Sequence, residues 1–275
     1  MSRRPSHRAH PQERRERAQR DKPARPEAGK LFRVAGLAAV QALAATRAEA
    51  IERLFFEAEH QKALAPLCAR LGETRKPFRL VGREELARVA GTPLNGGVVA
   101  LIAPPRVAEF DVGEARRWAR EGQPLLILDG VGNPHNLGAI VRSAAFFGLT
   151  RLVISDHPGQ AGPSEAAWRV AEGGLAHVQL YRAHSLPRVL PKLAPEWLVL
   201  GTALGKGRTP AEVGHKHAAA PVLGNEEEGL PPETLAACAG RLTLPGGGAV
   251  QSLNVAATAA ILAHWFTQGR DAGGR

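Results

Sequence analysis

Residues 125–148, LLILDGVGNPHNLGAIVRSAAFFG, contain the transition that decides the fold of this chain. Four apolar residues at 125–128 predict a strand that is buried on both faces. After a short polar loop, Ile140, Ala144 and Phe147 recur on one helical face, and Gly148 marks the expected end of that helix. A buried strand followed by an amphipathic helix is the repeating unit of a parallel α/β sheet.

The same rhythm continues toward the C-terminus. Apolar runs predict strands at residues 151–154, 178–181, 197–200, 221–223 and 241–244, and an alanine-rich helix covers residues 252–266. Strands that alternate with helices favour a doubly wound parallel sheet. We therefore expect an α/β domain over residues 123–270, with its ligands at the carboxyl ends of the strands.

A second, smaller α/β module is expected over residues 31–105. Its pattern predicts helices at residues 36–46, 60–71 and 84–90, and strands at 51–56, 78–81 and 97–103. Residues 106–122 follow the Pro104-Pro105 pair and contain a charged run. This segment is expected to be a linker with one short helix.

The charge of the chain is concentrated in residues 1–30. They hold ten Arg or Lys and four Asp or Glu, so they carry +6 of the formal net charge of +10. With four prolines and few large apolar side chains, this segment is expected to be a disordered basic tail. Such an arm can follow phosphate backbones, although a tail that only aids solubility stays an alternative.

The rest of the composition points to a cytoplasmic protein. The two cysteines, Cys68 and Cys238, lack the spacing of a zinc site or a disulfide framework. No apolar run approaches the length of a membrane span, and the N-terminus lacks the apolar stretch of an export signal. We expect no membrane association.

Three loops at strand ends carry the candidate chemistry. The first, 129–138, is no dinucleotide site, because the third glycine position of that fingerprint is His135. The second, 224–230, places three carboxylates between glycines, and Glu226 could orient an arginine. The third, 245–254, is glycine-rich, and Ser252 can cap the next helix.

Each loop alone also has a plain structural interpretation. Asn133 can be a turn residue, Asn136 a helix cap and Arg142 a solvated surface charge. The second loop can be a solvated acidic turn, and the third a flexible turn before a capped helix. No single loop decides between these interpretations.

Taken together, the loops resemble the three motifs of the SpoU, or TrmH-like, family of RNA ribose methyltransferases. The matching stretches are NPHNLGAIVRSAAFFG at 133–148, LGNEEEGL at 223–230, and LP at 244–245 through SLNV at 252–255. Order, spacing and strand-to-helix context agree. The third motif departs from the family at Gly246, where many members have methionine.

The resemblance implies an architecture that periodicity could not. It implies a C-terminal parallel sheet tied in a trefoil knot, and homodimers formed through the knotted domains. It also implies that the small N-terminal domain binds the RNA substrate and has a fold related to that of an RNA-binding ribosomal protein. It also implies S-adenosylmethionine as methyl donor. The positions that would bind it here are Thr202, Ala203, Gly224, Asn225, Gly229, Leu244, Ser252, Leu253 and Asn254.

The resemblance further implies transfer of the methyl group to a ribose 2′-hydroxyl of tRNA or rRNA. We expect Arg142 to grip the adjacent phosphate and stabilise the developing alkoxide, because a guanidinium is too weak an acid to serve easily as a base. Glu226 would orient Arg142, Asn136 and Asn254 would hydrogen-bond loops and substrate, and Ser252 would touch the donor or cap the last helix. No metal is expected, since the leaving group is a neutral thioether.

Two alternatives stay open from the sequence. One is a non-catalytic RNA-binding or assembly factor on the same fold, against which the intact motif residues argue. The other is a knotted methyltransferase that modifies a base, although Arg142 with the NLGAI spacing favours ribose. The target RNA and nucleotide are not encoded in any motif.

Overall fold

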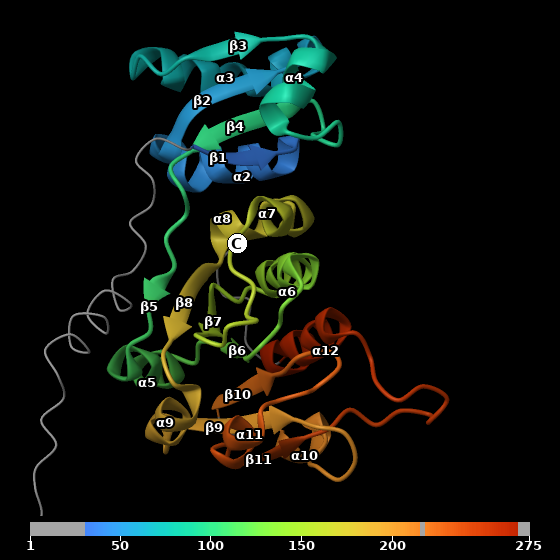
Figure 1. The fold of residues 1–275 in the computed structure, drawn as a ribbon. Helices are drawn as coiled ribbons and strands as arrows, with labels where there is room; N and C mark the ends of the chain where they lie inside the picture. The colour runs from blue at the N-terminus through green and yellow to red at the C-terminus, as the bar shows by residue number, and fades with distance from the viewer. Residues whose placement is uncertain (1–30, 215–217, 269–275) are drawn as a thin grey trace, which may run out of the picture. The chain divides into compact units, whose positions relative to one another are not determined.

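A computed structural model describes residues 31–214 and 218–268 of the protein (Figure 1). The basic segment 1–30, expected to be a tail, lies outside the described residues, as do 269 and 270 at the expected end of the large domain. The described chain forms two sheets, one of four strands and one of seven. Apart from one short edge strand, each sheet is built from the strands of one of the two segments that the pattern separated.

The four-stranded sheet is formed by β1 (Phe32–Ala35), β2 (Ile51–Phe56), β3 (Phe78–Leu80) and β4 (Val98–Ile102), in the order β1-β4-β2-β3. β4 runs antiparallel to β1 and β2, whereas β3 is parallel to β2. Its helices are α2 (Leu37–Arg47), α3 (Gln61–Glu73) and α4 (Arg83–Ala90). All six predicted elements are confirmed within a few residues. β1 was missed, because four residues with mixed exposure give no clear alternation.

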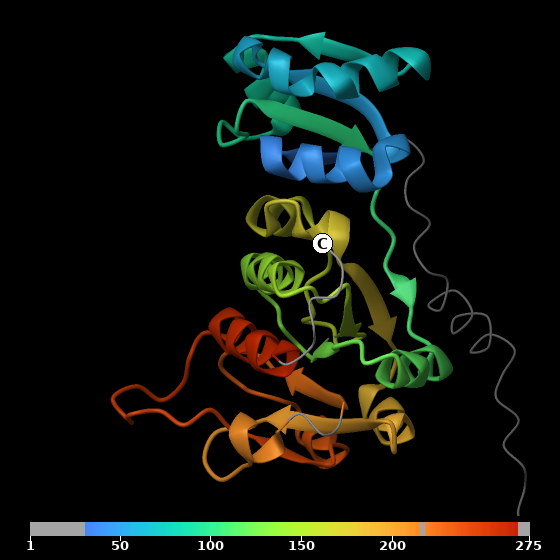
Figure 2. The same ribbon diagram turned by 180° about the vertical axis from the view of Figure 1, so that it is seen from behind.

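The seven-stranded sheet is parallel throughout, in the order β11-β9-β10-β6-β7-β8-β5 (Figures 1 and 2). The six predicted strands are confirmed. They are β6 (Leu126–Leu128), β7 (Arg151–Ser155), β8 (Gln179–Ala183), β9 (Trp197–Thr202), β10 (Ala218–Leu223) and β11 (Gly240–Leu242).

Helices pack on both faces of this sheet, which explains the continuous apolar runs of its strands. Leu126 and Leu128 of β6 belong to a core with α6 (Pro134–Phe146), α7 (Glu165–Ala171), α8 (Gly174–His177) and α12 (Val255–Thr267). Ile127, between them, belongs to a second core with α5 (Val112–Arg120) and α9 (Leu186–Val189). Two short helices, α10 (Pro210–Val213) and α11 (Pro232–Ala236), follow β9 and β10.

The segment expected to be a linker contributes to the large sheet. β5 (Ala108–Glu109) pairs in parallel with β8 as the edge strand, and α5 packs Ala115 and Trp118 into the second core. The predicted short helix is present, yet residues 108–120 are structural parts of the α/β domain. A two-residue strand lies below the length that a hydrophobic pattern can reveal.

Candidate functional site

The three loops identified from the sequence follow β6, β10 and β11. In the sheet order, β10 lies beside β6 and β9, and β9 lies beside β11. All these strands are parallel, so their carboxyl ends lie at one edge of the sheet. That edge is the usual ligand site of an open α/β sheet.

The first loop is held rigidly on both sides. The backbone N–H of Asp129 donates to the Leu223 carbonyl at 2.8 Å, and Val131 exchanges two hydrogen bonds of 3.1 Å with the side chain of Gln160. Asn133 accepts from the His135 N–H at 2.8 Å and is the N-cap of α6. The interpretation of Asn136 as the cap is therefore wrong, and its side chain is left for another role.

Asn136 connects the first loop to the other two. Its amide nitrogen donates to a carboxylate oxygen of Glu226, and its amide oxygen accepts from Nδ2 of Asn254 at 3.2 Å. Asn254 in turn accepts from the Ala256 N–H at 2.8 Å and caps α12. We call these three residues, Asn136, Glu226 and Asn254, the amide relay. The relay brings together one predicted site residue from each loop.

The acidic loop resolves its charge repulsion by geometry. Glu226 is half-buried and points into the relay, whereas Glu227 and Glu228 are exposed. The Asn225 side chain accepts from the N–H groups of Glu227 and Glu228 at 2.8 and 3.2 Å and donates to the Gly130 carbonyl at 3.2 Å. Asn225 and Gly229 also exchange backbone hydrogen bonds of 2.9 and 3.0 Å. Asn225 is thus the internal support of the loop.

Gly224 is required by the loop itself. A Cβ at this position would lie 2.3 Å from the carbonyl carbon and oxygen of Gly229, a distance that real Cβ atoms do not show. The sequence suggested that Gly224 lets a ligand approach closely. The structure gives another reason, the close approach of two segments of one loop, so a larger residue here would disturb the loop before any ligand binds.

A buried hydrogen bond fastens the far end of the acidic loop. Thr234, on α11, donates to Oδ2 of Asp129 at 2.7 Å, and both residues are almost fully buried. Cys238 donates weakly to the Thr234 carbonyl at 3.3 Å. Burial, and secondarily the negative charge of Asp129, raises the pKa of the Cys238 thiol to about 11. The loop is therefore tied back to the end of β6.

The third loop lies open. Ser252 is exposed, and α12 begins at Val255 with Asn254 as its cap, so the expectation that Ser252 caps this helix is wrong. Side chains of Val250 and Leu253 are 73% and 51% exposed. Apart from the glycine and its two chain neighbours, no heavy atom of the described residues lies within 4 Å of a Cβ placed on Gly246 or Gly247. Two large apolar side chains at a strand-end loop offer surface for a ligand.

Arg142 does not contact Glu226, the residue that was expected to orient it. Its Nη2 pairs with Oε2 of Glu172 at 2.9 Å, and both side chains are more than half exposed. Arg142 follows Asn136 by six residues, roughly 9 Å along the helix and on a different face. The expected Glu226–Arg142 contact is therefore absent from the described residues, and Glu226 holds Asn136 instead.

The remaining donor-site candidates lie at the ends of β9 and β11. The Thr202 hydroxyl donates to the Val222 carbonyl at 3.0 Å, and the Ala203 N–H donates to the Leu242 carbonyl at 3.0 Å. Leu244, two residues after the end of β11, is half-buried. Together with Gly224, Asn225 and Gly229, these residues surround one end of three adjacent strands.

Several residues that shape the site were missed from the sequence. Gln160 lies between β7 and α7 and Thr234 lies on α11, outside the three loops, so none of the motifs marks them. Glu172 could have been noticed from the sequence, because the two glycines that follow it in the run AEGG at 171–174 indicate the end of a helix and a turn. The other omissions reflect contacts across long sequence separations.

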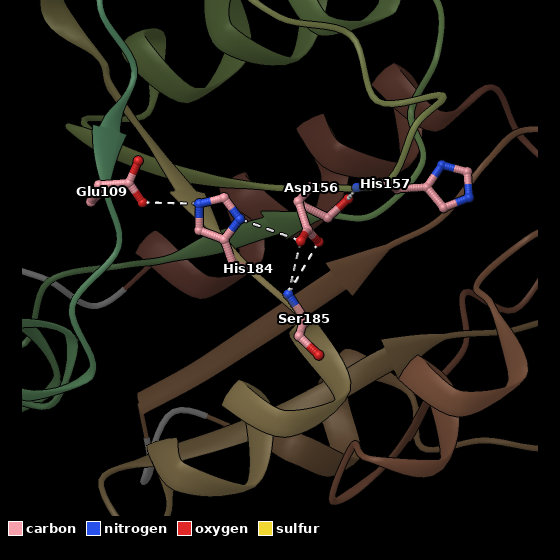
Figure 3. A network of polar contacts seen from close by, with 6 residues as sticks. Glu109, Asp156, His157, His184 and Ser185 are labelled. Carbon is pink, nitrogen blue, oxygen red and sulfur yellow. Dashed lines mark hydrogen bonds and ion pairs between the residues drawn. The ribbon is translucent and has the colours of Figure 1, made fainter. Parts of the chain in front are cut away.

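A further polar cluster lies at the ends of β7 and β8 (Figure 3). His184 lies between Glu109 and Asp156, with nitrogen–oxygen distances of 3.1 and 3.3 Å, and the Ser185 N–H donates to both oxygens of Asp156 at 3.1 and 3.2 Å. The cluster ties edge strand β5 to its neighbours. His184 is exposed, so the cluster is a surface fastening of the sheet.

Within residues 31–214 and 218–268, no group of three or more His, Cys, Asp or Glu is arranged to hold a metal ion. None of the helices described is long and apolar enough to cross a membrane. Both cysteines are free thiols.

Comparison with known families matches both modules. The SpoU rRNA methylase family model matches residues 123–264, and the model for the RNA 2′-O ribose methyltransferase substrate-binding domain matches residues 33–108. The first match covers more than half of the chain. It includes all three loops and the amide relay.

Individual relatives agree. The chain is 33% identical over 232 residues to the 23S rRNA (guanosine-2′-O-)-methyltransferase RlmB of Escherichia coli K12, covering 82% of this chain and 93% of that protein. It is 32% identical over 240 residues to the uncharacterised tRNA/rRNA methyltransferase YfiF of Escherichia coli O157:H7, covering 86% of this chain and 68% of that protein.

Solved structures show the same fold. A TrmH-family protein from Porphyromonas gingivalis superposes with a TM-score of 0.68 at 25% identity, covering 86% of this chain and 89% of that one. The SpoU methyltransferase AviRb of Streptomyces viridochromogenes, solved with AdoMet, gives 0.66 at 21% identity, covering 89% and 92%. With both modules, all three motifs and near full-length relatives in agreement, the chain belongs to the SpoU rRNA methylase family and is an RNA 2′-O-methyltransferase.

Proposed function

We propose that this enzyme methylates a ribose 2′-hydroxyl of ribosomal RNA, with S-adenosylmethionine as the methyl donor. The observation that carries the proposal is the amide relay, which joins one residue from each family motif at the carboxyl edge of the large sheet. The similarity to RlmB supports an rRNA substrate over a tRNA substrate. An rRNA substrate also favours a cytoplasmic location for the enzyme.

The residues at this edge fit the donor. Thr202, Ala203 and Leu244 lie at the ends of two strands, and Gly224, Asn225 and Gly229 form a compact loop at the end of the strand between. Exposed Leu253, beside Ser252 and Asn254, adds apolar surface of the kind that an adenosine ring requires. These residues would hold S-adenosylmethionine, which supplies an electrophilic methyl group when bound.

The chain's own part in the reaction is to position the ribose and to stabilise charge. As the 2′-hydroxyl gives up its proton to water, its oxygen gains the negative charge with which it would attack the methyl carbon, and the methyl–sulfur bond would break to leave a neutral thioether. Arg142 would grip the neighbouring phosphate and stabilise that charge, as a fixed cation does in other group-transfer sites. Glu226 and Asn254 would hold Asn136 in place, so that its amide and the loops around it keep one geometry.

The domain roles follow the family matches. Residues 31–105 would bind RNA, and residues 106–270 would form the methyltransferase domain, with 1–30 as a basic RNA-binding tail. Within the large domain, β10 lies between β9 and β6, and the chain returns from edge strand β11 to pack α12 against α6 and β10. This return supports the proposal that the C-terminal segment is threaded as a trefoil knot.

A homodimer through the large domain is proposed on the apolar face of α6 and α12. Phe146 is 81% exposed and Ile261 is 43% exposed. The ring of Phe147 packs edge-to-face against Phe146 and at a tilt against His264, with ring centroids 5.1 and 5.3 Å apart. Exposed aromatic clusters of this kind mark interfaces. Phe146→Glu should shift the protein to monomer in analytical ultracentrifugation, whereas Leu94→Glu, at a 75% exposed site of the small module, should not.

Ribose-methylation mapping of total RNA from cells with and without the gene tests the proposed reaction. One 2′-O-methyl mark in rRNA should disappear with the gene and return with the wild-type chain, but not with Arg142→Ala. A lost mark in tRNA would overturn the rRNA assignment. A lost base methylation would overturn the ribose assignment, and unchanged RNA with no donor binding in calorimetry would favour an assembly factor.

A further inference from the structure

We infer that Glu172 is a positioning residue for the reaction, holding the guanidinium of Arg142 in the orientation that grips RNA phosphate. This inference rests on the proposed role of Arg142. It assigns to Glu172 the task that the sequence suggested for Glu226, which the structure commits to Asn136.

The contact between the two side chains has the form of a support. Oε2 of Glu172 lies 2.9 Å from Nη2 of Arg142, so the carboxylate forms an ion pair at one corner of the guanidinium. The planar group has two further nitrogens, Nε and Nη1, and a phosphate binds such a fork through two donors. Glu172 can therefore keep its contact while Arg142 binds RNA. Arg142 is the residue that touches substrate, and Glu172 acts through it.

The backbone of Glu172 is poorly suited to stability alone. Glu172 has φ 44° and ψ 47°, the left-handed region, and is one of three non-glycine residues with positive φ in the described part of the chain. Glycine or asparagine adopts this conformation at lower cost. The ion pair adds little to the free energy of unfolding, because exposed pairs of this type barely stabilise a fold. A carboxylate held in an unfavourable backbone for a weak contact suggests a functional constraint.

The packing of the neighbouring helices fixes where this carboxylate lies. A Cβ on Gly138 would lie 2.5 Å from the Ala167 carbonyl, so α6 and α7 cross closely there. Arg142 is one turn beyond Gly138 on the same face of α6. Just past the end of α7, a Cβ on Gly174 would lie 3.2 Å from Cα of Arg142. The turn that carries Glu172 is thus pressed against α6 at Arg142 itself.

Two variants at this position separate charge from backbone strain. Glu172→Gln keeps the shape and the strained backbone but removes the charge. Glu172→Gly removes the side chain and relieves the strain. If Glu172 positions Arg142, both should lower kcat about tenfold with no change in donor affinity, because a misplaced charge-stabilising group affects the transition state most. The KM for RNA should rise by a smaller factor, since the phosphate contact of Arg142 is loosened as well. Tm should rise for Glu172→Gly, so activity and stability move in opposite directions.

A conservative variant and a second background complete the test. Glu172→Asp keeps a carboxylate and should retain more turnover than Glu172→Gln. In an Arg142→Lys background, for which we expect low turnover, Glu172→Gln should change kcat by less than about twofold, since effects through one shared group do not add. An undiminished effect in that background would show that Glu172 acts independently of Arg142 and would overturn the inference.

The outcomes also separate this inference from the proposed function. Wild-type kcat in both Glu172→Gln and Glu172→Gly, with Arg142→Ala inactive, would reject the role of Glu172 and leave that of Arg142 intact. A normal rate in Arg142→Ala would reject the role of Arg142, and that of Glu172 with it.

Discussion

Helix α6 carries two polar contacts that differ in kind. At its first turn, Asn136 joins the acidic loop and the last helix through the amide relay, where Asn136 and Glu226 are half-buried. Further along, Arg142 forms an exposed ion pair with Glu172. The first contact links three loops of the large domain. The second links two neighbouring helices at the surface.

The two contacts lie on the two sides of the proposed site. We call the loops joined by Asn136, Glu226 and Asn254 the relay side, where the donor is proposed to bind, and Arg142 with Glu172 the charged side, where RNA is proposed to bind. The relay and the Asp129–Thr234 hydrogen bond tie the three loops to one another through side chains of the chain itself, on the side where we propose that the donor binds. The exposed ion pair is screened by solvent and contributes about 0–1 kcal/mol at most. Arg142 can therefore take up a phosphate at small cost. We expect substitutions on the two sides to separate donor binding from RNA chemistry.

Arg142→Ala is expected to have the largest effect. It should lower kcat by roughly 10³-fold, because a fixed cation at developing negative charge is worth that much in other enzymes. Donor affinity, measured by calorimetry, should stay within a few-fold, since Arg142 lies outside the relay. Arg142→Lys should also be slow, because an ammonium lacks the planar two-point grip. A large loss of donor affinity in either variant would break the separation of the two sides.

The sequence predicted the relay side better than the charged side. Parallel strands and their loop positions follow from apolar runs, so the meeting of Asn136, Glu226 and Asn254 at one edge could be anticipated. Their specific bonds could not, because each partner is 90 or more residues away in sequence. Glu226 was assigned to Arg142 on charge alone, and the helix geometry of α6 overrides that choice.

Short or tertiary features escaped prediction for a related reason. β5 has two residues, and its place in the sheet depends on pairing with β8. Gly224 was singled out for close approach to a ligand, whereas the atoms that exclude a side chain there belong to Gly229 and Leu230. Local patterns identify elements and special residues. They do not identify which residues, distant in sequence, contact these positions in the folded chain.

The reactivity of Cys238 tests whether the relay side is closed in solution. Burial, with the Asp129 charge, raises the pKa of this thiol to about 11 from an ordinary 9.0. The thiolate fraction at pH 8 is then about one in a thousand, so alkylation should be roughly 100-fold slower than for a free cysteine and should rise with pH toward 11. Mass spectrometry of a Cys68→Ser variant isolates this thiol. Fast reaction at pH 8 would mean that the end of the acidic loop opens readily.

A pair of variants at Asn254 separates its two hydrogen bonds. Asn254→Ala removes the cap of α12 and the bond to Asn136, so it should cost about 1 kcal/mol of unfolding free energy and weaken donor binding about fivefold. Asn254→Ser keeps a capping hydroxyl but cannot reach Asn136 in the same way. It should preserve Tm while weakening donor binding equally. Unchanged donor affinity in both would remove Asn254 from the site.

Deletion of residues 1–30 should have the smallest effect on the reaction and sharpens the account of the charged side. The segment carries +6 of the net +10, so it can add phosphate contacts beyond that of Arg142. Each contact to a single strand contributes a slope of roughly −0.7 to log affinity against log salt, so the truncated protein should bind RNA with a flatter dependence and lose most affinity at low salt. The methylated nucleotide and kcat should not change, because backbone contacts do not specify sequence. Binding titrations at several salt concentrations, with Arg142→Ala in the full chain as the matched control, measure both slopes. If deletion leaves the slope unchanged, the phosphate contacts must come from the folded modules. Arg142, supported by Glu172, would then contribute a larger fraction of the phosphate contacts that determine RNA affinity.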